Sequence, residues 1–311
     1  MTIDSDALVI DVRGLSRRFG AKRALDGVGL TVPRGVVFGL IGENGAGKTT
    51  LIKHVLGLLR AQHGSVRVFG LDPVADPVGV LSRVGTLSED RDLPGWMQVR
   101  ELIRYSKAFY PGWDDAYAES LREAFELDPK ARVKHLSRGQ QARAGLLVAL
   151  AFRPELLVLD EPSSGLDPVV RRDILGAIVR TIADEGRTVL FSSHLLDEVE
   201  RVGDLVAMID RGRIVLDGPI DDVKARHRRV TIRLDEPSDD APRLDAAILV
   251  EGSGRDWSAL CEGDLARVID DVARLGGRVV DDHAANLDEI FVARVASHRT
   301  RPRPSPEVAL A

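Results

Sequence analysis

The sequence contains a single cysteine, Cys261, among its 311 residues. One thiol cannot build a disulfide framework, so the fold depends on a buried core, and the chain suits a reducing compartment. No stretch reaches the roughly 20 apolar residues that a bilayer-spanning helix needs. The first residues, MTIDSDALVIDVRG, are too acidic for a secretory signal. These absences predict a soluble, cytoplasmic chain that would reach a membrane only through a partner.

A positive charge balance is also missing. The 43 basic and 48 acidic side chains give a formal net charge of -5, whereas a general nucleic-acid binder normally carries a basic balance or patch. We therefore expect no nucleic-acid partner. The length of the chain allows one large domain or two smaller ones.

Two sequence patterns divide the chain, and the first extends to about residue 225. Residues 1–90 contain apolar strands separated by turns and one helix, expected at 48–59, while residues 90–152 are mostly helical by pattern. Strands and helices then alternate again and end in an expected hairpin at 205–218. Nearly continuous apolar strands that alternate with helices indicate an α/β fold with a mostly parallel sheet.

The second pattern predicts a small α+β domain at residues 226–297. It contains an amphipathic helix from Asp264 to Leu275 and a short helix near 286–295. The last residues, 298–311, are rich in proline and are expected to be disordered. The strand candidates of this domain are 230–234, 246–252 and 278–283.

Residues 42–49, GENGAGKT, match the phosphate-loop pattern GxxxxGKT between an apolar strand and a helix. Gly42, Gly45 and Gly47 allow the backbone to curl so that its N–H groups converge on phosphate oxygens. Lys48 would reach the β- and γ-phosphates, and the hydroxyl of Thr49 would ligate Mg²⁺. The other residues of this stretch assigned to nucleotide binding are Glu43, Asn44, Ala46 and Thr50.

A second motif, ELLVLDEP at 155–162, ends an apolar strand with two carboxylates. At the ligand-binding edge of a parallel sheet, Asp160 would hold Mg²⁺ through water, and Glu161 would polarise the water that attacks the γ-phosphate. An acidic pair at a strand end is, by itself, as often a simple loop-facing pair. The phosphate loop upstream favours the catalytic interpretation.

The polar stretch LSRGQ at 136–140 opens a helical run. Ser137 and Gln140 have the spacing of a helix N-cap and its capping box. Capping does not account for Gly139, because a glycine at a helix opening costs stability unless its backbone approaches something closely. The stretch therefore indicates a close contact at Gly139.

Together these motifs resemble those of the ATP-binding subunits of ABC transporters. The phosphate loop, LSRGQ, LLVLDEP, SSGLD at 163–167 and SSH at 192–194 occur in that family's order, and the resemblance covers residues 8 to about 225. It implies a P-loop NTPase of ABC type with a mostly parallel sheet core, an antiparallel β subdomain and a helical insert, followed by the small C-terminal α+β appendage. The implied activity is ATP hydrolysis coupled to transmembrane transport, with ATP and Mg²⁺ bound.

The resemblance assigns roles to further residues. Phe19 falls where an aromatic ring stacks on adenine, with a core phenylalanine as the alternative. His194 would contact the γ-phosphate, and Asp167 would meet the phosphate loop of an opposing subunit. Glu89 stands at a metal-contacting position where the family usually has glutamine, and Arg138 replaces the first glycine of the commoner LSGGQ.

The resemblance also implies two protein partners. One is a separate transmembrane permease subunit, which would hold this cytoplasmic chain at the inner face of the cell membrane. The other is a second ATP-binding subunit, identical or related, packed head to tail. Ser137, Gly139 and Gln140 of each chain would then close over the γ-phosphate held by the other. Residues 109–140 look similar to ATPase subunits of drug or antibiotic exporters.

Several alternatives remain open. The aromatic residues between positions 96 and 117 could form a partner surface or the core of the helical insert. The chain could be an ABC-type ATPase acting on ribosomes or DNA, although its single cassette and acidic balance disfavour this. A kinase or GTPase would have no role for LSRGQ or SSGLD. The C-terminal domain could bind a regulatory ligand or protein.

Overall fold

The computed structural model describes residues 8–90, 92–183 and 186–300. The chain divides into two compact units, Met1–Ile214 and Val215–Ala311. The expected disordered tail lies outside the described residues from residue 301 onward, and helix α10 (Leu287–Thr300) includes residues 298–300. The domain boundaries expected from the sequence stay predictions.

The central sheet contains six strands: β3 (Val37–Ile41), β5 (Val84–Leu87), β6 (Leu156–Asp160), β7 (Thr188–Ser193), β8 (Leu205–Asp210) and β9 (Arg213–Pro219), of which β9 crosses the boundary between the units at residue 215. Their order is β5-β6-β7-β3-β8-β9, and the pairs from β5 to β8 are parallel. Every residue of β3, β6 and β7 is buried, as expected for apolar strands covered on both faces. The mostly parallel core is thus confirmed.

A second, antiparallel sheet contains β1 (Leu8–Phe19), β2 (Lys22–Pro33) and β4 (His63–Val68), in the order β2-β1-β4. Phe19 pairs with Lys22 at the end of the β1–β2 hairpin, where Gly20 has a φ of 56°. This register puts Phe19 and Lys22 at the tip of the hairpin, while residues such as Leu15 and Leu25 are buried in the core.

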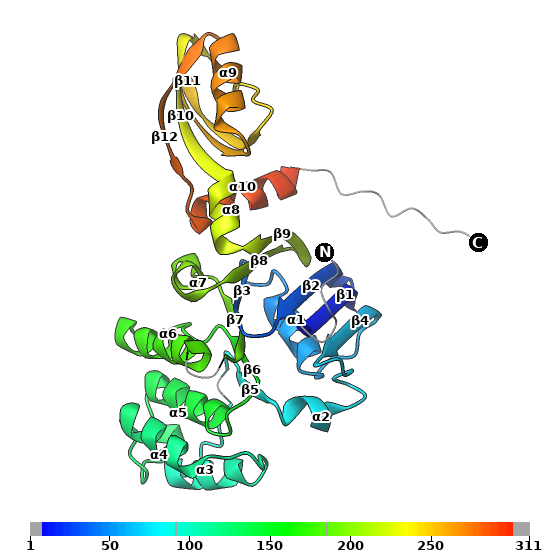
Figure 1. Cartoon of the computed structure of the whole chain (residues 1–311), viewed down its shortest axis with the longest axis vertical. Helices are drawn as coiled ribbons and strands as arrows, with labels where there is room; N and C mark the ends of the chain where they lie inside the picture. Colours follow the sequence, from blue (N-terminus) through cyan, green and yellow to red (C-terminus); the bar gives the residue numbers. More distant parts are fainter. Residues whose placement is uncertain (1–7, 91, 184–185, 301–311) are drawn as a thin grey trace, which may run out of the picture. The chain divides into compact units, whose positions relative to one another are not determined.

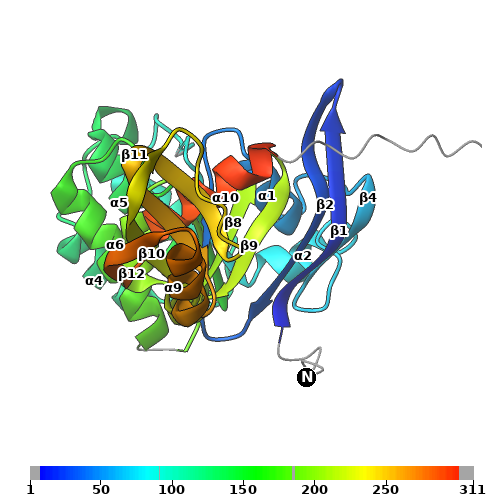
Figure 2. The ribbon, with the colours of Figure 1, turned by 90° about the horizontal axis from the view of Figure 1, so that it is seen from above.

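The helices of the first unit are α1 (Lys48–Val55), α2 (Pro77–Leu81), α3 (Val99–Lys107), α4 (Asp115–Ala124), α5 (Arg138–Leu150), α6 (Pro168–Ala183) and α7 (Leu196–Val202), with a short 3-10 helix at Val133–His135. The expected helical insert consists of α3, α4 and α5. Figures 1 and 2 show this insert and the antiparallel sheet at opposite ends of the unit, with the parallel sheet between them. The helical insert and the antiparallel β subdomain expected beside the parallel sheet are thus both present.

Helix α1 is shorter than the sequence predicts. It was expected to cover residues 48–59 but ends at Val55, and Gly57 has a φ of 71°. A Cβ atom on Gly57 would lie 2.2 Å from the carbonyl oxygen of Pro73. The apolar spacing continues past the helix because Leu56 is buried too, so the pattern alone does not reveal where the chain turns.

The second unit is an α+β fold, as the sequence predicts. Its elements are α8 (Ile220–Arg226), β10 (His227–Ser238), β11 (Ala247–Glu262), α9 (Leu265–Arg274), β12 (Gly277–Ala284) and α10. The three strands form an antiparallel sheet in the order β11-β10-β12. Val268 and Val272 of α9 share a core with Ile232 and Trp257 of the sheet. Cys261 is buried in this core, and burial raises the pKa of its thiol to about 11.

Several elements of the second unit are longer than expected, among them β10, which covers His227–Ser238 where residues 230–234 were predicted. Strand β11 extends ten residues past the predicted end at residue 252, to Glu262, and Gly252 at φ 146° and Gly254 at φ 59° interrupt its apolar pattern. Helix α10 continues past the expected end at residue 295.

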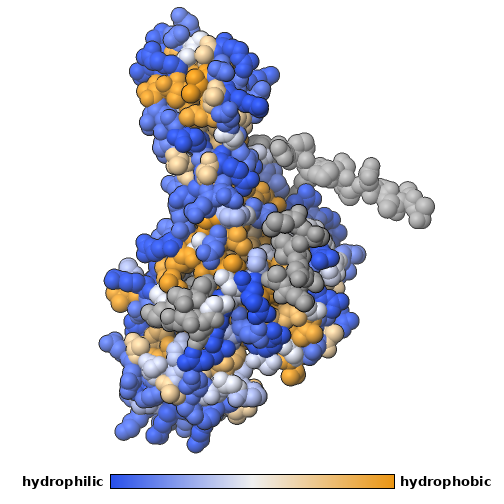
Figure 3. Space-filling view, viewed as in Figure 1, coloured by the Kyte–Doolittle hydropathy of each residue, from blue (hydrophilic) through white to orange (hydrophobic). Residues whose placement is uncertain are grey.

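Figure 3 shows apolar side chains gathered on the visible face of this unit. Its exposed large hydrophobic residues include Ile269, Leu275, Val280 and Val292. Over the ranges that the structure describes, no helix is long and apolar enough to cross a membrane.

Candidate active site

Three neighbouring strands of the central sheet end at sequence motifs. Gly42 follows β3, Glu161 follows β6 and His194 follows β7, and these strands are adjacent and parallel in the order β6-β7-β3. The carboxyl ends of parallel strands lie at one edge of the sheet, where ligands bind in open α/β folds. The topology therefore brings the phosphate loop, the acidic pair and the histidine to one edge.

The phosphate loop packs tightly against its surroundings. Gly45 and Gly47 have φ values of 79° and 124°, which are strained for residues with a Cβ atom. A Cβ on Gly42 would lie 2.4 Å from the carbonyl oxygen of Ile209, and one on Gly47 would lie 2.9 Å from that of Ala24. Gly47 also precedes α1 without a side-chain cap. Packing therefore requires glycine at 42 and 47, and the positive φ requires it at 45. The loop leaves the N–H groups of the first turn of α1 available to an anion.

Lys48 is held inside this loop. Its ammonium group donates hydrogen bonds to the carbonyl oxygens of Gly42 at 2.6 Å and Glu43 at 3.3 Å. It also forms an ion pair of 2.9 Å with Oε1 of Glu161, and the two side chains are only 5% and 4% exposed. Ala46 is buried and joins the loop to the start of β9 through its carbonyl, which accepts from the N–H of Gly212 at 2.7 Å.

Glu161 is fixed on several sides. Its φ is 48°, and its backbone N–H donates to Oγ of Ser192 at 2.9 Å. The Ser192 hydroxyl donates in turn to Oδ1 of Asp160 at 2.6 Å. Nδ1 of His194 lies 2.6 Å from Oε2 of Glu161. Ser192 thus links Asp160 to the backbone of Glu161, while His194 contacts the Glu161 carboxylate directly. The sequence reasoning missed the role of Ser192, although it is the first serine of SSH.

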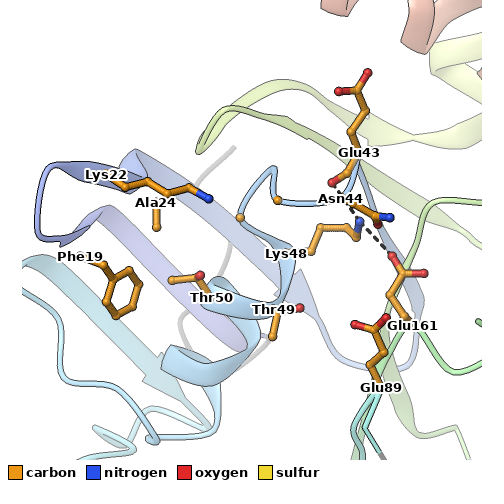
Figure 4. Close-up of a pocket in the computed structure, with 12 residues that line it drawn as sticks. Phe19, Lys22, Ala24, Glu43, Asn44, Lys48, Thr49, Thr50, Glu89 and Glu161 are labelled. Atoms are coloured by element: carbon orange, nitrogen blue, oxygen red, sulfur yellow. Dashed lines mark hydrogen bonds and ion pairs between the residues drawn. The ribbon is translucent and has the colours of Figure 1, made fainter.

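A cavity of about 390 Å³ opens beside this cluster, within the size range of small-molecule sites. Figure 4 shows Phe19 on one side of it and Glu161 with Glu89 on the other, with Lys48 and Thr49 between them. The Phe19 side chain is 45% exposed and is not part of the core. The lining residues are Phe19, Lys22, Ala24, Glu43, Asn44, Gly45, Gly47, Lys48, Thr49, Thr50, Glu89 and Glu161. Lys22 and Ala24 were not singled out from the sequence, because β2 carries no recognisable motif.

The donors beside the cavity fit a magnesium ion that arrives with a nucleotide. Mg²⁺ is usually held by one or two carboxylates together with phosphate oxygens and water. Thr49 and Glu89 line the cavity, and Asp160 is linked to Glu161 through Ser192. Over residues 8–90, 92–183 and 186–300, no group of three or more histidine, cysteine or acidic side chains could hold a metal by itself.

The LSRGQ segment forms the predicted capping box. Ser137 is the N-cap of α5, its Oγ accepts from the N–H of Gln140 at 3.2 Å, and Oε1 of Gln140 accepts from the N–H of Ser137 at 3.0 Å. A Cβ on Gly139 would lie 2.7 Å from Cγ2 of Val170 in α6. The glycine is therefore required by a contact within the chain, which the sequence could not reveal because the two residues are on different helices.

Asp167 caps the other helix of this contact. Its Oδ1 accepts from the N–H groups of Val169 at 3.0 Å and Val170 at 3.1 Å, and these hydrogen bonds lower the pKa of the Asp167 carboxyl. Ser137, Gly139, Gln140 and Asp167 are not among the residues that line the cavity. The predicted site residues thus fall into two groups, one around the cavity and one at the starts of α5 and α6.

Comparisons of the sequence with known proteins agree with the motifs. The family model described as "ABC transporter" matches residues 25–164. The daunorubicin resistance ATP-binding protein DrrA3 of Streptomyces coeruleorubidus is 38% identical over 222 residues, which cover 70% of each chain. The bacitracin transport ATP-binding protein BcrA of Bacillus licheniformis is 32% identical over 226 residues, which cover 71% of this chain and 73% of BcrA.

Solved structures share the fold of the described cassette. An ATP-binding subunit of an ABC transporter matches with a TM-score of 0.65 at 29% identity, over 70% of this chain and 92% of that chain. A bacterial ABC transporter cassette, solved as a dimer, matches with a TM-score of 0.61 at 20% identity, over 68% of this chain and 98% of that chain. At the latter identity the likeness concerns the fold alone.

Proposed function

The chain belongs to the ABC transporter family as an ATP-binding subunit that hydrolyses ATP to drive transport, and we propose that it powers export of a drug- or antibiotic-like compound. Two relatives support this substrate class by their names, a daunorubicin resistance protein and a bacitracin transport protein. The compound would cross the membrane through a separate transmembrane permease subunit. The chain would then act as a peripheral subunit at the inner, cytoplasmic face of the cell membrane.

The arrangement of the cavity is the observation that carries the nucleotide-binding proposal. An exposed aromatic ring lies on one side and carboxylates on the other, with the phosphate loop between them (Figure 4). We place adenine on Phe19, the phosphates along residues 42–50 and the γ-phosphate toward Glu161. Mg²⁺ would be held beside Thr49, Asp160 and Glu89, where it would neutralise phosphate charge.

Hydrolysis would depend on the release of Glu161 from Lys48. A triphosphate that attracts the ammonium group competes with Glu161 for it, because Lys48 now forms a buried ion pair with that carboxylate. Glu161 would then accept a proton from the attacking water. His194 already contacts Oε2 of Glu161, so it would both orient this carboxylate and contact the γ-phosphate.

A second ATP-binding subunit would complete the site. The starts of α5 and α6 do not line the chain's own cavity, and the first turn of α5 begins at Ser137, which is exposed. A helix N-terminus favours an anion. We propose that two cassettes pack head to tail, with Ser137, Gly139 and Gln140 over the partner's γ-phosphate and Asp167 against its phosphate loop.

The permease subunit would bind beside the helical insert. Trp96 is 71% exposed, and the exposed rings of Tyr105 and Phe109 contact each other edge to face at 5.0 Å between centroids. Exposed aromatic side chains are enriched at the centres of protein interfaces. Tyr110, in contrast, stacks on Phe152 at 3.7 Å. The aromatic residues of the insert thus divide into packed rings and rings available to a partner.

The export proposal can be tested in the source organism. We expect a strain that lacks this chain to accumulate more of a fluorescent anthracycline or to become more sensitive to bacitracin. Wild-type protein should reverse the change, and Glu161→Gln should not. A deletion strain that accumulates neither compound class and keeps its sensitivity would contradict the substrate class, while loss of ATPase activity in purified Glu161→Gln would still support the catalytic roles.

A further inference from the structure

A buried carboxylate with no role in the proposed reaction, that of Glu198 in α7, bonds to residues next to Glu161 and His194. Glu198 of α7 is 1% exposed. Its Oε2 accepts hydrogen bonds from the hydroxyls of Ser163 at 2.6 Å and Ser193 at 3.2 Å, and its Oε1 lies 3.1 Å from Nε of Arg171. Burial raises the pKa of the Glu198 carboxyl, while the serine hydroxyls and Arg171 oppose this rise. One side chain therefore joins the loop after β6, the end of β7 and the first turns of α6.

Two of these contacts hold segments that carry the catalytic groups. Ser163 follows Glu161 by two residues, and Ser193 directly precedes His194. Oγ of Ser193 also accepts from the N–H of Leu195 at 3.0 Å, which fixes the turn around His194. The φ of 48° at Glu161 is sparsely populated for a non-glycine residue and persists only where the surroundings impose it. Both ends of the contact between Glu161 and His194 are thus anchored to the same carboxylate.

The third contact extends to the LSRGQ segment. Arg171 belongs to the start of α6, which Asp167 caps, and the preceding residue, Val170, packs against Gly139. The ion pair between Arg171 and Glu198 therefore connects the start of α6, where Val170 contacts Gly139, to the segments that carry Glu161 and His194. Separating the buried Glu198 carboxylate from its three polar partners would cost free energy. The side chains of Glu198, Ser163, Ser193 and Arg171 are therefore expected to move together.

We propose that Glu198 is a positioning residue that holds Glu161 and His194 in the geometry needed for hydrolysis. The inference rests on the catalytic roles proposed above for Glu161 and His194. Without the carboxylate, Ser163, Ser193 and Arg171 lose their common partner, and the backbone around the catalytic pair can shift. Nucleotide binding would change less, because Phe19 and the phosphate loop belong to other elements of the fold.

The test compares Glu198→Ala, Glu198→Gln and the control Asp197→Asn in steady-state ATPase assays, with binding of a fluorescent ATP analogue and thermal unfolding measured in parallel. Asp197 is exposed on the same helix. We expect Glu198→Ala to lower kcat by about tenfold or more, as for other residues that orient a functional group, with Kd and KM changed by less than about threefold. Glu198→Gln still accepts from the serines but loses its charge toward Arg171, so its kcat should lie between those of Glu198→Ala and wild type, about threefold below wild type. Asp197→Asn should match the wild type.

Wild-type kcat in a folded Glu198→Ala variant would overturn the proposal. The proposal would also be overturned if the decrease in kcat equals the decrease in the fraction of folded protein at the assay temperature. If Glu198→Ala does not fold, wild-type kcat in Glu198→Gln has the same meaning. Glu161→Gln in the same assay separates the two levels of inference: full turnover there removes Glu161 from the mechanism, while an inactive Glu161→Gln with a fully active Glu198→Ala removes only Glu198.

Discussion

The ammonium group of Lys48 lies 2.9 Å from Oε1 of Glu161, and both side chains are buried. The residue that would bind the phosphates and the residue that would activate water therefore neutralise each other. Because a triphosphate attracts the same ammonium group, binding of the nucleotide and release of the carboxylate are expected to be one event. This coupling makes the pair the most informative place to perturb the protein.

Lys48→Ala should weaken nucleotide binding and also destabilise the fold. The substitution removes the cation from the phosphate site and leaves Glu161 as a buried charge without its partner, which typically costs about 3 kcal/mol. Urea unfolding and titration with a fluorescent ATP analogue measure the two effects. The double variant Lys48→Ala/Glu161→Gln should recover most of the stability but not the affinity. Nucleotide affinity at the wild-type level in either variant would contradict the assignment of residues 42–49 as the phosphate-binding loop.

Glu161→Gln should bind ATP and hydrolyse it very slowly. A general base typically contributes about 10²- to 10⁴-fold to the rate, so kcat should fall by at least about 10²-fold. With hydrolysis blocked, the variant should accumulate as a dimer at saturating ATP and Mg²⁺, which light scattering after size-exclusion chromatography detects. Undiminished turnover would exclude Glu161 as the base. A variant that remains monomeric would instead contradict the head-to-tail arrangement.

Gly139→Ala should destabilise the protein without any second subunit present. The added Cβ would lie 2.7 Å from Cγ2 of Val170, and overpacking of this kind costs about 1–3 kcal/mol. Val170→Ala in the same chain removes the clashing methyl groups, so the double variant should regain stability relative to Gly139→Ala. Chemical denaturation of the four proteins gives the coupling energy. Additive effects in this cycle would show that the close contact does not determine the need for glycine.

Trp96→Ala should leave the fold intact and weaken binding to the permease subunit. Truncating an exposed side chain usually changes stability by less than about 0.5 kcal/mol, whereas loss of an aromatic anchor from an interface can cost about 2 kcal/mol. Thermal unfolding and co-purification with the coexpressed permease measure the two effects. Tyr110→Ala is the matched control, because this ring stacks on Phe152 and its loss should lower stability. Full retention of the permease by Trp96→Ala would place the partner surface elsewhere.

The second unit should lose stability as the pH falls. His227 is fully buried, its Nδ1 lies 2.6 Å from the carbonyl oxygen of Val223, and its Nε2 lies 2.9 Å from Arg294. Burial lowers the pKa of His227 below its ordinary 6.5, and the positive charges of Arg294 and Arg226 lower it further. In the unfolded chain the imidazole of His227 therefore binds a proton near the ordinary pKa of 6.5, while in the folded chain it stays neutral to lower pH. The free energy of unfolding thus decreases as the pH drops below 6.5.

His227→Gln isolates this contribution from that of the other histidines. The free energy of unfolding of the wild type, measured with urea, should decrease by up to about 1.4 kcal/mol per pH unit below the ordinary pKa because of this histidine. The variant has no group to protonate at this position, so its stability should depend less steeply on pH between 7.5 and 5.5, whatever its absolute stability. Equal slopes for the two proteins would show that His227 is not held neutral in the folded state.

The sequence predicted the parts of this protein that depend on local order and spacing. The phosphate loop, the acidic pair and the ABC-type fold follow from motifs placed between strands and helices, and the capping box at Ser137 follows from a three-residue spacing. Lys48 and Glu161 lie 2.9 Å apart at one sheet edge, because parallel strands end together, and their roles in the reaction stay predictions.

Contacts between distant segments were not predictable in the same way. Val170 stands opposite Gly139 only because α5 and α6 pack at that point, and no periodicity records which side chain fills a gap. In the sequence Glu198 resembles any acidic residue of a surface helix, and only the structure shows that it contacts Ser163 in the loop after β6 and Ser193 at the end of β7. The end of α1 was also missed, since the close approach of Pro73 to Gly57 is a tertiary contact that overrides an apolar helical pattern.

The burial of Cys261 gives the chain a clean background for chemical labelling. The reactive form of cysteine is the thiolate, and a pKa of about 11 leaves roughly one thiol in 10⁴ ionised at neutral pH. The chain has no other cysteine, so a single cysteine introduced at an exposed position outside the proposed site, such as Ser120, would react selectively with a maleimide dye. Energy transfer between two such dyes could then follow the approach of two subunits in real time, with the native thiol left in place.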